Sequence, residues 1–215
     1  MNRTAIVIGA TGLVGSQVLD QLLEDKSYQK VKVFHRRSTG VVHPKLEEHI
    51  VDFKELDSWK SLIAGDELYS ALGTTIKKAG GQEAQYTIDF TYQYETAKAA
   101  AENGVKKFAL VSSAGANPKS RAFYTKLKGE LDEAVKELPF EVTVILRPSI
   151  LAGNRNENRL GEVIGIFLAR IFTKIPGLKK YRPILAGKVA EGMLNALHKC
   201  PTGYHIFELD EIFYL

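Results

Sequence analysis

The sequence predicts an α/β fold built on a doubly wound parallel sheet, and three observations lead to that prediction. Short apolar runs rich in β-branched residues alternate along the chain with longer stretches of helical spacing. A glycine-rich turn joins the first run to the first helical stretch. No internal repeat, low-complexity tract or linker divides the 215 residues. We therefore expect a single domain over 1–215, with a core in 1–150 and a lid and C-terminal elements in 151–215.

The strands are predicted from apolar runs of the length that a buried parallel strand needs. His49–Asp52 is the weakest of these runs. In chain order the predicted strands are Thr4–Ile8, Val31–Phe34, His49–Asp52, Leu68–Leu72, Phe108–Ser112, Val142–Leu146 and Tyr204–Leu209. Because helical stretches separate most of them, right-handed crossovers are expected to place helices on both faces of the sheet.

The helices are predicted from apolar residues three or four positions apart, such as Val14, Val18 and Leu22. The longest helical stretch stops at Asn103-Gly104, a pair that is typical of a helix C-terminus. In chain order the predicted helices are Leu13–Glu24, Leu56–Ile63, Ala84–Glu102, Tyr124–Leu138, Val163–Phe172 and Lys188–His198. The segment Gly153–Glu162 between the last strand of the core and the fifth helix is polar and predicts a loop.

Composition narrows the class of protein. A content of 45% hydrophobic and 25% charged residues fits a globular domain, and the single Cys200 excludes a disulfide scaffold. No apolar stretch has the length of a secretory signal or of a membrane span, so we expect a cytoplasmic protein with no membrane partner. A net charge of +4 suits an anionic ligand but is too small to predict nucleic-acid binding. The histidines and the cysteine show no metal-ligand spacing.

The turn Gly9–Gly15 has the spacing G-x-x-G-x-x-G between a predicted strand and a predicted helix. Gly9 allows a tight turn, Gly12 lets a pyrophosphate approach the backbone, and Gly15 lets helix and strand pack closely. A phosphate there would meet free N–H groups at the positive end of the helix dipole. In this context the turn predicts a dinucleotide site rather than a structural turn.

The residues that follow the second strand select the form of the cofactor. A protein that binds NAD usually has an Asp or Glu at this point, which bonds the ribose 2′-hydroxyl. Here Arg36 and Arg37 stand in that place, and two guanidinium groups can hold a 2′-phosphate. We therefore expect NADP(H) rather than NAD, the alternative being two solvated arginines. Asp52, at the end of the third strand, either accepts from the adenine amino group or caps a helix.

Tyr124 and Lys128 have the spacing Y-x-x-x-K, which puts both on one face of a helix. The same spacing occurs at Tyr28/Lys32 and Tyr94/Lys98, so position decides between the three. Only Tyr124/Lys128 opens the helix after the fifth strand, at the carboxyl edge where ligands bind in this fold. Ser112 ends that strand and brings a hydroxyl to the same place.

These three side chains suit carbonyl reduction. Hydride transfer to a carbonyl builds negative charge on its oxygen, which needs a proton and hydrogen-bond donors. Tyr124 would supply the proton, and the nearby ammonium of Lys128 favours the phenolate that remains. Lys128 could also bond the nicotinamide ribose, and Ser112 could orient the carbonyl oxygen.

The sequence resembles the atypical members of the short-chain dehydrogenase/reductase superfamily, and more narrowly the Tat-interacting-protein-like group of oxidoreductases. The motifs that carry the resemblance are Gly9–Gly15, Leu72-Gly73-Thr74-Thr75, Ser112-Ser113-Ala114-Gly115-Ala116, Tyr124/Lys128 and Arg147-Pro148. The resemblance implies a Rossmann fold and a catalytic Tyr124, Lys128 and Ser112. It also implies NADP(H) bound by Thr11, Gly12, Leu13, Val14, Arg36, Arg37, Leu72, Gly73, Tyr124, Lys128, Leu151 and Arg159.

Two classes of function remain open from the sequence. The first is an NADPH-dependent reductase of a small carbonyl substrate, acting as a monomer or homodimer in the cytoplasm. The second is a sensor that binds NADPH and acts through a protein partner with little turnover. The presence of Tyr124 favours the reductase, since sensors of this fold often lack the tyrosine. A semialdehyde dehydrogenase would need a cysteine nucleophile, and Cys200 lies far in sequence from the glycine turn.

The polar segment Asn154–Glu162 is expected either to form a lid over the nicotinamide end or to be a simple connector. Arg159 lies within it and would contact the cofactor if the segment forms the lid.

Overall fold

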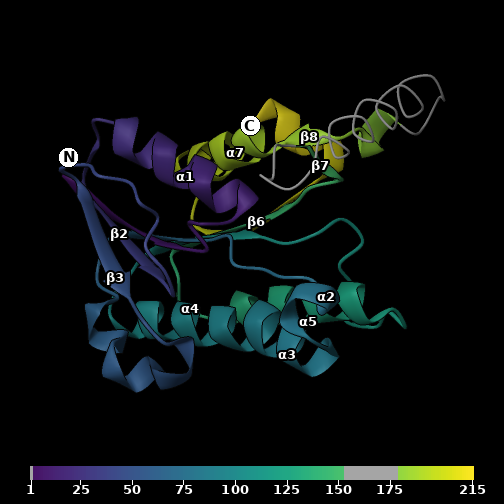
Figure 1. Cartoon of the computed structure of the whole chain (residues 1–215). Coiled ribbons are helices and arrows are strands. Elements are labelled where there is room, and N and C mark those ends of the chain that lie inside the picture. The colour runs from purple at the N-terminus through teal and green to yellow at the C-terminus, as the bar shows by residue number, and fades with distance from the viewer. Residues whose placement is uncertain (1, 153–178) are drawn as a thin grey trace.

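The computed structural model describes residues 2–152 and 179–215, and within them a seven-stranded sheet forms the centre of the molecule (Figure 1). The strand order is β3-β2-β1-β4-β5-β6-β9, and every neighbouring pair is parallel. The strands are β1 (Arg3–Ile8), β2 (Tyr28–His35), β3 (Leu46–Ile50), β4 (Glu67–Ser70), β5 (Lys107–Val111), β6 (Val142–Arg147) and β9 (Gly203–Glu208). The predicted doubly wound α/β fold is confirmed.

Helices cover both faces of the sheet (Figure 1). On one face α1 (Leu13–Glu24) packs against α7 (Ala186–Lys199), and on the other lie α4 (Tyr92–Glu102) and α5 (Phe123–Lys136). Each face has its own apolar core. In β1, Ala5 and Val7 belong to the core under α1 and α7, whereas Ile6 and Ile8 belong to the core under α4 and α5. A strand that is buried on both sides therefore has an unbroken apolar sequence.

The helical segment before β5 differs from the prediction. The expected continuous helix Ala84–Glu102 is divided into α3 (Gln82–Tyr86), the π-helical turn η3 (Thr87–Thr91) and α4. A π-helical turn adds a residue to the helical repeat and rotates the side chains beside it, and such turns are frequent at functional sites. In this chain the turn places the buried Asp89 toward the sheet's carboxyl edge and toward α5.

Smaller differences concern short elements. The predicted helix Leu56–Ile63 consists of two 3-10 turns, η1 (Phe53–Ser58) and η2 (Lys60–Leu62). β3 begins at Leu46, three residues earlier than predicted, because Glu47 and Glu48 lie on an edge strand that need not be apolar. The elements that the sequence did not predict are α2 (Ile76–Ala79), the paired β7 (Leu151–Ala152) and β8 (Ile184–Leu185), η4 (Lys179–Tyr181) and η5 (Leu209–Tyr214). The predicted loop Gly153–Glu162 and helix Val163–Phe172 lie outside the described residues.

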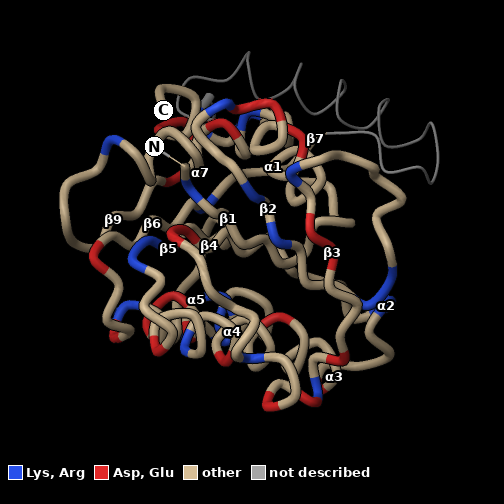
Figure 2. Tube along the Cα trace, turned by 90° about the vertical axis from the view of Figure 1, so that its left-hand side faces the viewer, with Lys and Arg blue, Asp and Glu red and all other residues tan. Residues whose placement is uncertain are grey.

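Basic and acidic residues are interspersed along the trace (Figure 2). This distribution agrees with the small net charge of +4. No helix in the described part of the chain combines the length and the apolar character needed to cross a membrane.

Candidate functional site

The glycine turn, the arginine pair and the Leu72-Gly73 segment follow the carboxyl ends of the neighbouring strands β1, β2 and β4. Ile8 in β1 is paired with Phe34 on one side and with Ser70 on the other. The next residue, Gly9, therefore lies between the end of β2 and the end of β4. The strand order reverses here, since β1 has β2 on one side and β4 on the other, and open α/β sheets bind ligands at such a point.

The glycine turn is packed so closely at two positions that a side chain would not fit. Gly9 has a φ of +83°, and a Cβ added there would lie 2.4 Å from the carbonyl carbon of Ala71. A Cβ on Gly15 would lie 2.1 Å from the oxygen of Gly9. The tight turn and the close packing predicted for these two glycines are confirmed. Because no other residue fits at either position, this close approach of the β1–α1 turn to β4 depends on glycine.

Gly12 is the N-cap of α1, and its lack of a side chain leaves the first turn of the helix without a side-chain cap. The N–H groups of a first helical turn have no partner within the helix, so they remain available to an anion. Thr11 beside Gly12 is exposed, Leu13 is half-buried, and Val14 is anchored in the core. The turn therefore fits the phosphates of a dinucleotide, and the individual contacts stay predictions.

The two arginines directly follow β2, one strand away from the glycine turn. Arg36 and Arg37 are both exposed. No ion pair joins either of them to another residue in the described ranges. This geometry suits a 2′-phosphate on the adenosine ribose, which is the role predicted for them.

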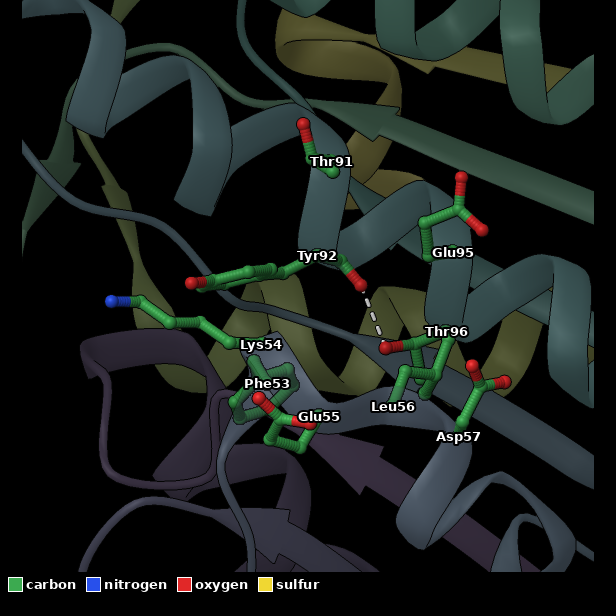
Figure 3. A pocket seen from close by; sticks show the side chains of 9 residues that line it. All are labelled: Phe53, Lys54, Glu55, Leu56, Asp57, Thr91, Tyr92, Glu95 and Thr96. Atoms are coloured by element: carbon green, nitrogen blue, oxygen red, sulfur yellow. Dashed lines mark hydrogen bonds between the residues drawn. The ribbon is translucent and has the colours of Figure 1, made fainter.

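Asp52 has a local structural role. Its carboxylate accepts a hydrogen bond of 3.0 Å from the backbone N–H of Lys54 and thereby caps η1. Of the two roles considered for Asp52, helix capping is confirmed, and a contact with adenine stays a prediction. A cavity of about 300 Å³ lies next to it, between η1 and α4 (Figure 3). Phe53 and Tyr92 stack in its wall with ring centroids 5.4 Å apart, and none of the predicted site residues that the structure describes lines it.

Tyr124 and Lys128 lie on one face of α5, as predicted. Tyr124 stands in the first turn with 41% of its surface exposed, and Lys128 one turn later is 4% exposed. The ammonium nitrogen of Lys128 lies 6.0 Å from the centre of the Tyr124 ring. The phenol is therefore open to solvent or substrate, while the cation behind it is enclosed by protein.

Asp89 is the partner of Lys128 that sequence reasoning missed. Its Oδ2 lies 3.9 Å from Nζ of Lys128, and its Oδ1 accepts a 2.7 Å hydrogen bond from the N–H of Thr74. Gln85 donates to the same carboxylate at 3.3 Å. Burial raises the pKa of Asp89, and Lys128 and these donors act against that rise. The carboxylate thus links the π-helical turn to α5 and to the loop after β4.

That loop also contains Leu72 and Gly73, two of the predicted cofactor-binding residues. A Cβ on Gly73 would lie 3.8 Å from Asp89 Oδ1, which is ordinary contact distance. Asp89 therefore holds the backbone on which the predicted cofactor contacts lie. An acidic residue within an otherwise uncharged stretch, Ala84–Tyr94, was the signal that could have revealed it.

Ser112 takes part in a second buried network. Its hydroxyl donates to Oδ2 of Asp132 at 3.0 Å, and Nε of Arg147 donates to the same oxygen at 2.8 Å. Arg147 also donates to Glu208 from its other side. Burial raises the pKa of Asp132, while Ser112, Arg147 and Lys128 oppose the rise. The proton of the Ser112 hydroxyl is committed to Asp132, so it does not point to an incoming carbonyl in this structure.

Asp132 follows Lys128 by one turn, so Tyr124, Lys128 and Asp132 form a line along α5. The exposed phenol is at one end of this line and the fully buried carboxylate at the other. Ser113, directly after Ser112, is half-buried and makes a long contact of 3.4 Å to the oxygen of Ala114. The two serines, the phenol and the ammonium therefore all lie on the carboxyl side of the sheet. Tyr124 is exposed and Ser113 half-buried, whereas Ser112 and Lys128 are buried.

Two further predicted residues lie at the C-terminal side. Leu151 is half-buried in β7, where it pairs with Ile184 of β8. Arg159 and the proposed lid Asn154–Glu162 lie outside the described residues.

Comparisons with known proteins identify a family and similar sequences. The model of a family described as NAD(P)H-binding matches residues 9–164. The chain is 38% identical to the mitochondrial protein Fmp52 of Aspergillus fumigatus over 92% of this chain and 88% of that protein. It is 41% identical to the mitochondrial Fmp52 of Candida glabrata over 74% of this chain and 68% of that one.

Solved structures with low sequence identity share the fold. A short-chain dehydrogenase/reductase superfamily protein from Agrobacterium tumefaciens with bound NAD has a TM-score of 0.71 at 17% identity, covering 96% of this chain and 77% of that one. The UDP-N-acetylglucosamine 4-epimerase of Methanobrevibacter ruminantium has a TM-score of 0.73 at 16% identity, covering 99% and 80%.

The comparisons also correct one prediction and limit two others. The expected cytoplasmic location is contradicted by the relatives, because they are named as mitochondrial proteins. The family model supports a nicotinamide cofactor, and the choice of NADP(H) over NAD stays a prediction. The narrower resemblance to the Tat-interacting-protein-like group also stays a prediction. From the family match, the chain belongs to the NAD(P)H-binding family, and it shares its fold with these solved structures.

Proposed function

We propose that this protein is an NADPH-dependent reductase of small carbonyl compounds. The observation that carries the proposal is the pair on α5, an exposed Tyr124 in front of a buried Lys128, at the same sheet edge as the glycine turn. A side chain that donates a proton must reach its substrate, and 41% exposure leaves Tyr124 accessible. A cation enclosed by protein acts more strongly on a neighbouring charge than a solvated one.

The binding half of the proposal rests on the adjacent strands. The first turn of α1 would hold the pyrophosphate, with Gly12 allowing the phosphates close to the backbone. Arg36 and Arg37 would hold the 2′-phosphate as charge-assisted hydrogen-bond donors. Leu72 and Gly73, fixed by Asp89 through the N–H of Thr74, would line the path between the two ends of the cofactor.

Bound NADPH would supply the hydride. As negative charge builds on the carbonyl oxygen, the Tyr124 hydroxyl transfers its proton to that oxygen. The ammonium of Lys128 stabilises the phenolate that remains, and Asp89 keeps the ammonium in place. Tyr124 then regains a proton from solvent, to which its side chain is open. The product is the alcohol of the substrate.

A turnover screen tests this function. The purified full chain would be incubated with NADPH and a panel of aldehydes and ketones, with loss of the reduced nicotinamide and formation of the alcohol both measured. We expect turnover with a subset of the panel. Tight NADPH binding without turnover on any compound would contradict the reductase and favour a protein that senses the cofactor.

A further inference from the structure

The loop between β2 and β3 carries the two arginines, and a single carboxylate on β3 holds it. Glu48 pairs with Val33 of β2 in the sheet and directs its side chain to the loop. Its Oε2 accepts from the hydroxyl of Ser38 at 2.7 Å, and its Oε1 accepts from the N–H of Thr39 at 2.8 Å. The hydroxyl of Thr39 donates to Oε1 as well.

Glu48 contacts the chain on both sides of the arginine pair. On the near side, Nε2 of the buried His35 lies 3.5 Å from its Oε1, and on the far side it holds Ser38 and Thr39. Arg36 and Arg37 are the two residues between these contacts. The chain after the pair is therefore anchored to Glu48 by hydrogen bonds, the chain before it ends β2 at the buried His35, and both guanidinium groups stay exposed.

The loop is ordered further by its own side chains. The hydroxyl of Ser38 accepts from the N–H of Gly40 at 3.0 Å, and that of Thr39 accepts from the N–H of Val41 at 3.2 Å. Both hydroxyls thus connect Glu48 to the next turn of the loop. Burial raises the pKa of Glu48, but hydrogen bonds from Thr39 and Ser38 outweigh burial and hold its pKa below the usual range. The ionised form is the one that holds the loop.

We propose that Glu48 is a positioning residue for the cofactor's 2′-phosphate and that it sets the preference for NADPH over NADH. This inference rests on the proposed function, in which Arg36 and Arg37 bind that phosphate. Two arginines on a free loop would lose backbone and side-chain freedom on binding, and a loop that is already ordered loses less. The negative charge of Glu48 does not oppose the phosphate strongly, because three donors from Ser38 and Thr39 occupy its oxygens.

The test compares Glu48→Gln with Glu47→Gln in the full chain. The control removes the same charge from the neighbouring position on β3, where Glu47 bonds Lys30 and His49 instead of the loop. Affinities would be measured by calorimetry for adenosine 2′,5′-bisphosphate and for 5′-AMP, and then for NADPH and NADH. We expect Glu48→Gln to weaken the two ligands that carry a 2′-phosphate about tenfold and to leave the other two unchanged. Glu47→Gln should change none of them.

A second variant keeps the inference testable if Glu48→Gln unfolds. Thr39→Ala removes one of the two loop hydroxyls that donate to Glu48 and changes no residue of the sheet, and it should weaken the same two ligands. In the double variant the two losses of affinity should not add, because both substitutions disrupt the same hydrogen bond between Thr39 and Glu48.

The possible results distinguish a failure of this inference from a failure of the proposed function on which it rests. If the wild type binds both adenosine ligands equally, the assigned arginine site and the role of Glu48 are both overturned. If the wild type prefers the 2′-phosphate, and Arg36→Ala/Arg37→Ala abolishes that preference while Glu48→Gln and Thr39→Ala keep it, only the role of Glu48 is overturned.

Discussion

The ammonium of Lys128 lies 3.9 Å from the carboxylate of Asp89, and both side chains are almost completely buried. Asp89 comes from a π-helical turn and Lys128 from α5, so the pair joins two elements that are distant in sequence. Removing one partner of a buried pair leaves the other charge uncompensated, which costs far more than losing an exposed pair. The position of Lys128 behind Tyr124 therefore depends on Asp89.

Asp89→Asn tests this dependence with almost no change of shape. We expect the free energy of unfolding to fall by about 3 kcal/mol, since Lys128 loses its nearest counter-charge. Urea denaturation at neutral pH measures the effect. Glu83→Gln, which changes an exposed carboxylate six residues earlier, is the matched control and should stay within about 0.5 kcal/mol of the wild type. Equal effects of the two substitutions would contradict the assigned role of Asp89.

Tyr124→Phe removes the hydroxyl that would donate the proton and keeps the aromatic ring. On a substrate that the wild type reduces, we expect kcat to fall at least about a hundredfold, because general acid catalysis contributes that much. The dissociation constant of NADPH should not change. Tyr94→Phe serves as a control, since Tyr94 and Lys98 have the same spacing on a different helix. A variant at Tyr124 that turns over like the wild type would show that another group is the acid.

The fold was predictable because its signals are local. The runs of buried strands, the glycine spacing and the helical period of α1 each follow from neighbouring residues, and they lead to the observed sheet. The positions of Tyr124 and Lys128 followed in the same way, because a four-residue spacing on a helix fixes a common face.

The contacts that tune the site were not predictable, because they join distant parts of the chain. The π-helical turn depends on packing against α5, and helical periodicity alone indicates one continuous helix. The bond from Ser112 to Asp132 and the bonds from Ser38 and Thr39 to Glu48 cross between elements. No spacing rule places a partner across the fold in this way.

Replacing both Arg36 and Arg37 by Ala should change cofactor preference. We expect NADPH affinity to fall roughly ten- to a hundredfold, since one charge-assisted contact contributes about 1.5–3 kcal/mol. NADH affinity should stay near its wild-type value because NADH has no 2′-phosphate. Fluorescence titration with each cofactor measures both constants. Wild-type protein that binds NADH as tightly as NADPH would contradict the preference itself.

We expect stability to depend on pH through Glu67, which begins β4 at the amino end of the sheet. This buried carboxylate accepts from Tyr69 at 2.8 Å and from Arg3 at 3.2 Å, and Tyr28 donates to it as well. Burial raises the pKa of Glu67, but hydrogen bonds from His198, Tyr28 and Tyr69 outweigh burial and lower it from 4.5 to about 2.

A lowered pKa in the folded state means that Glu67 stabilises the protein above pH 4.5 and loses this contribution as the pH falls from 4.5 toward about 2. Glu67→Gln should therefore lower the free energy of unfolding at pH 7 by about 3 kcal/mol and flatten its decline in that acid range. Denaturation curves at a series of pH values measure both effects. Glu133→Gln, at an exposed position on α5, should leave the decline as steep as in the wild type.

The two serines after β5 should separate structure from chemistry. The Ser112 hydroxyl is buried and donates a hydrogen bond to Asp132, which also accepts one from Arg147. Ser112→Ala removes one of these bonds and should cost about 1 kcal/mol of unfolding free energy. The Ser113 hydroxyl is half-buried and makes only a long contact of 3.4 Å to the oxygen of Ala114, so it can rotate toward a substrate oxygen.

Ser113→Ala should therefore lower kcat more than Ser112→Ala does, while it changes stability less. Kinetics on a confirmed substrate compare the loss of kcat in the two variants, and urea denaturation compares their loss of stability. If Ser112→Ala lowers kcat more than Ser113→Ala at unchanged stability, the Ser112 hydroxyl turns away from Asp132 when substrate binds. The orienting role predicted for Ser112 from the sequence would then hold.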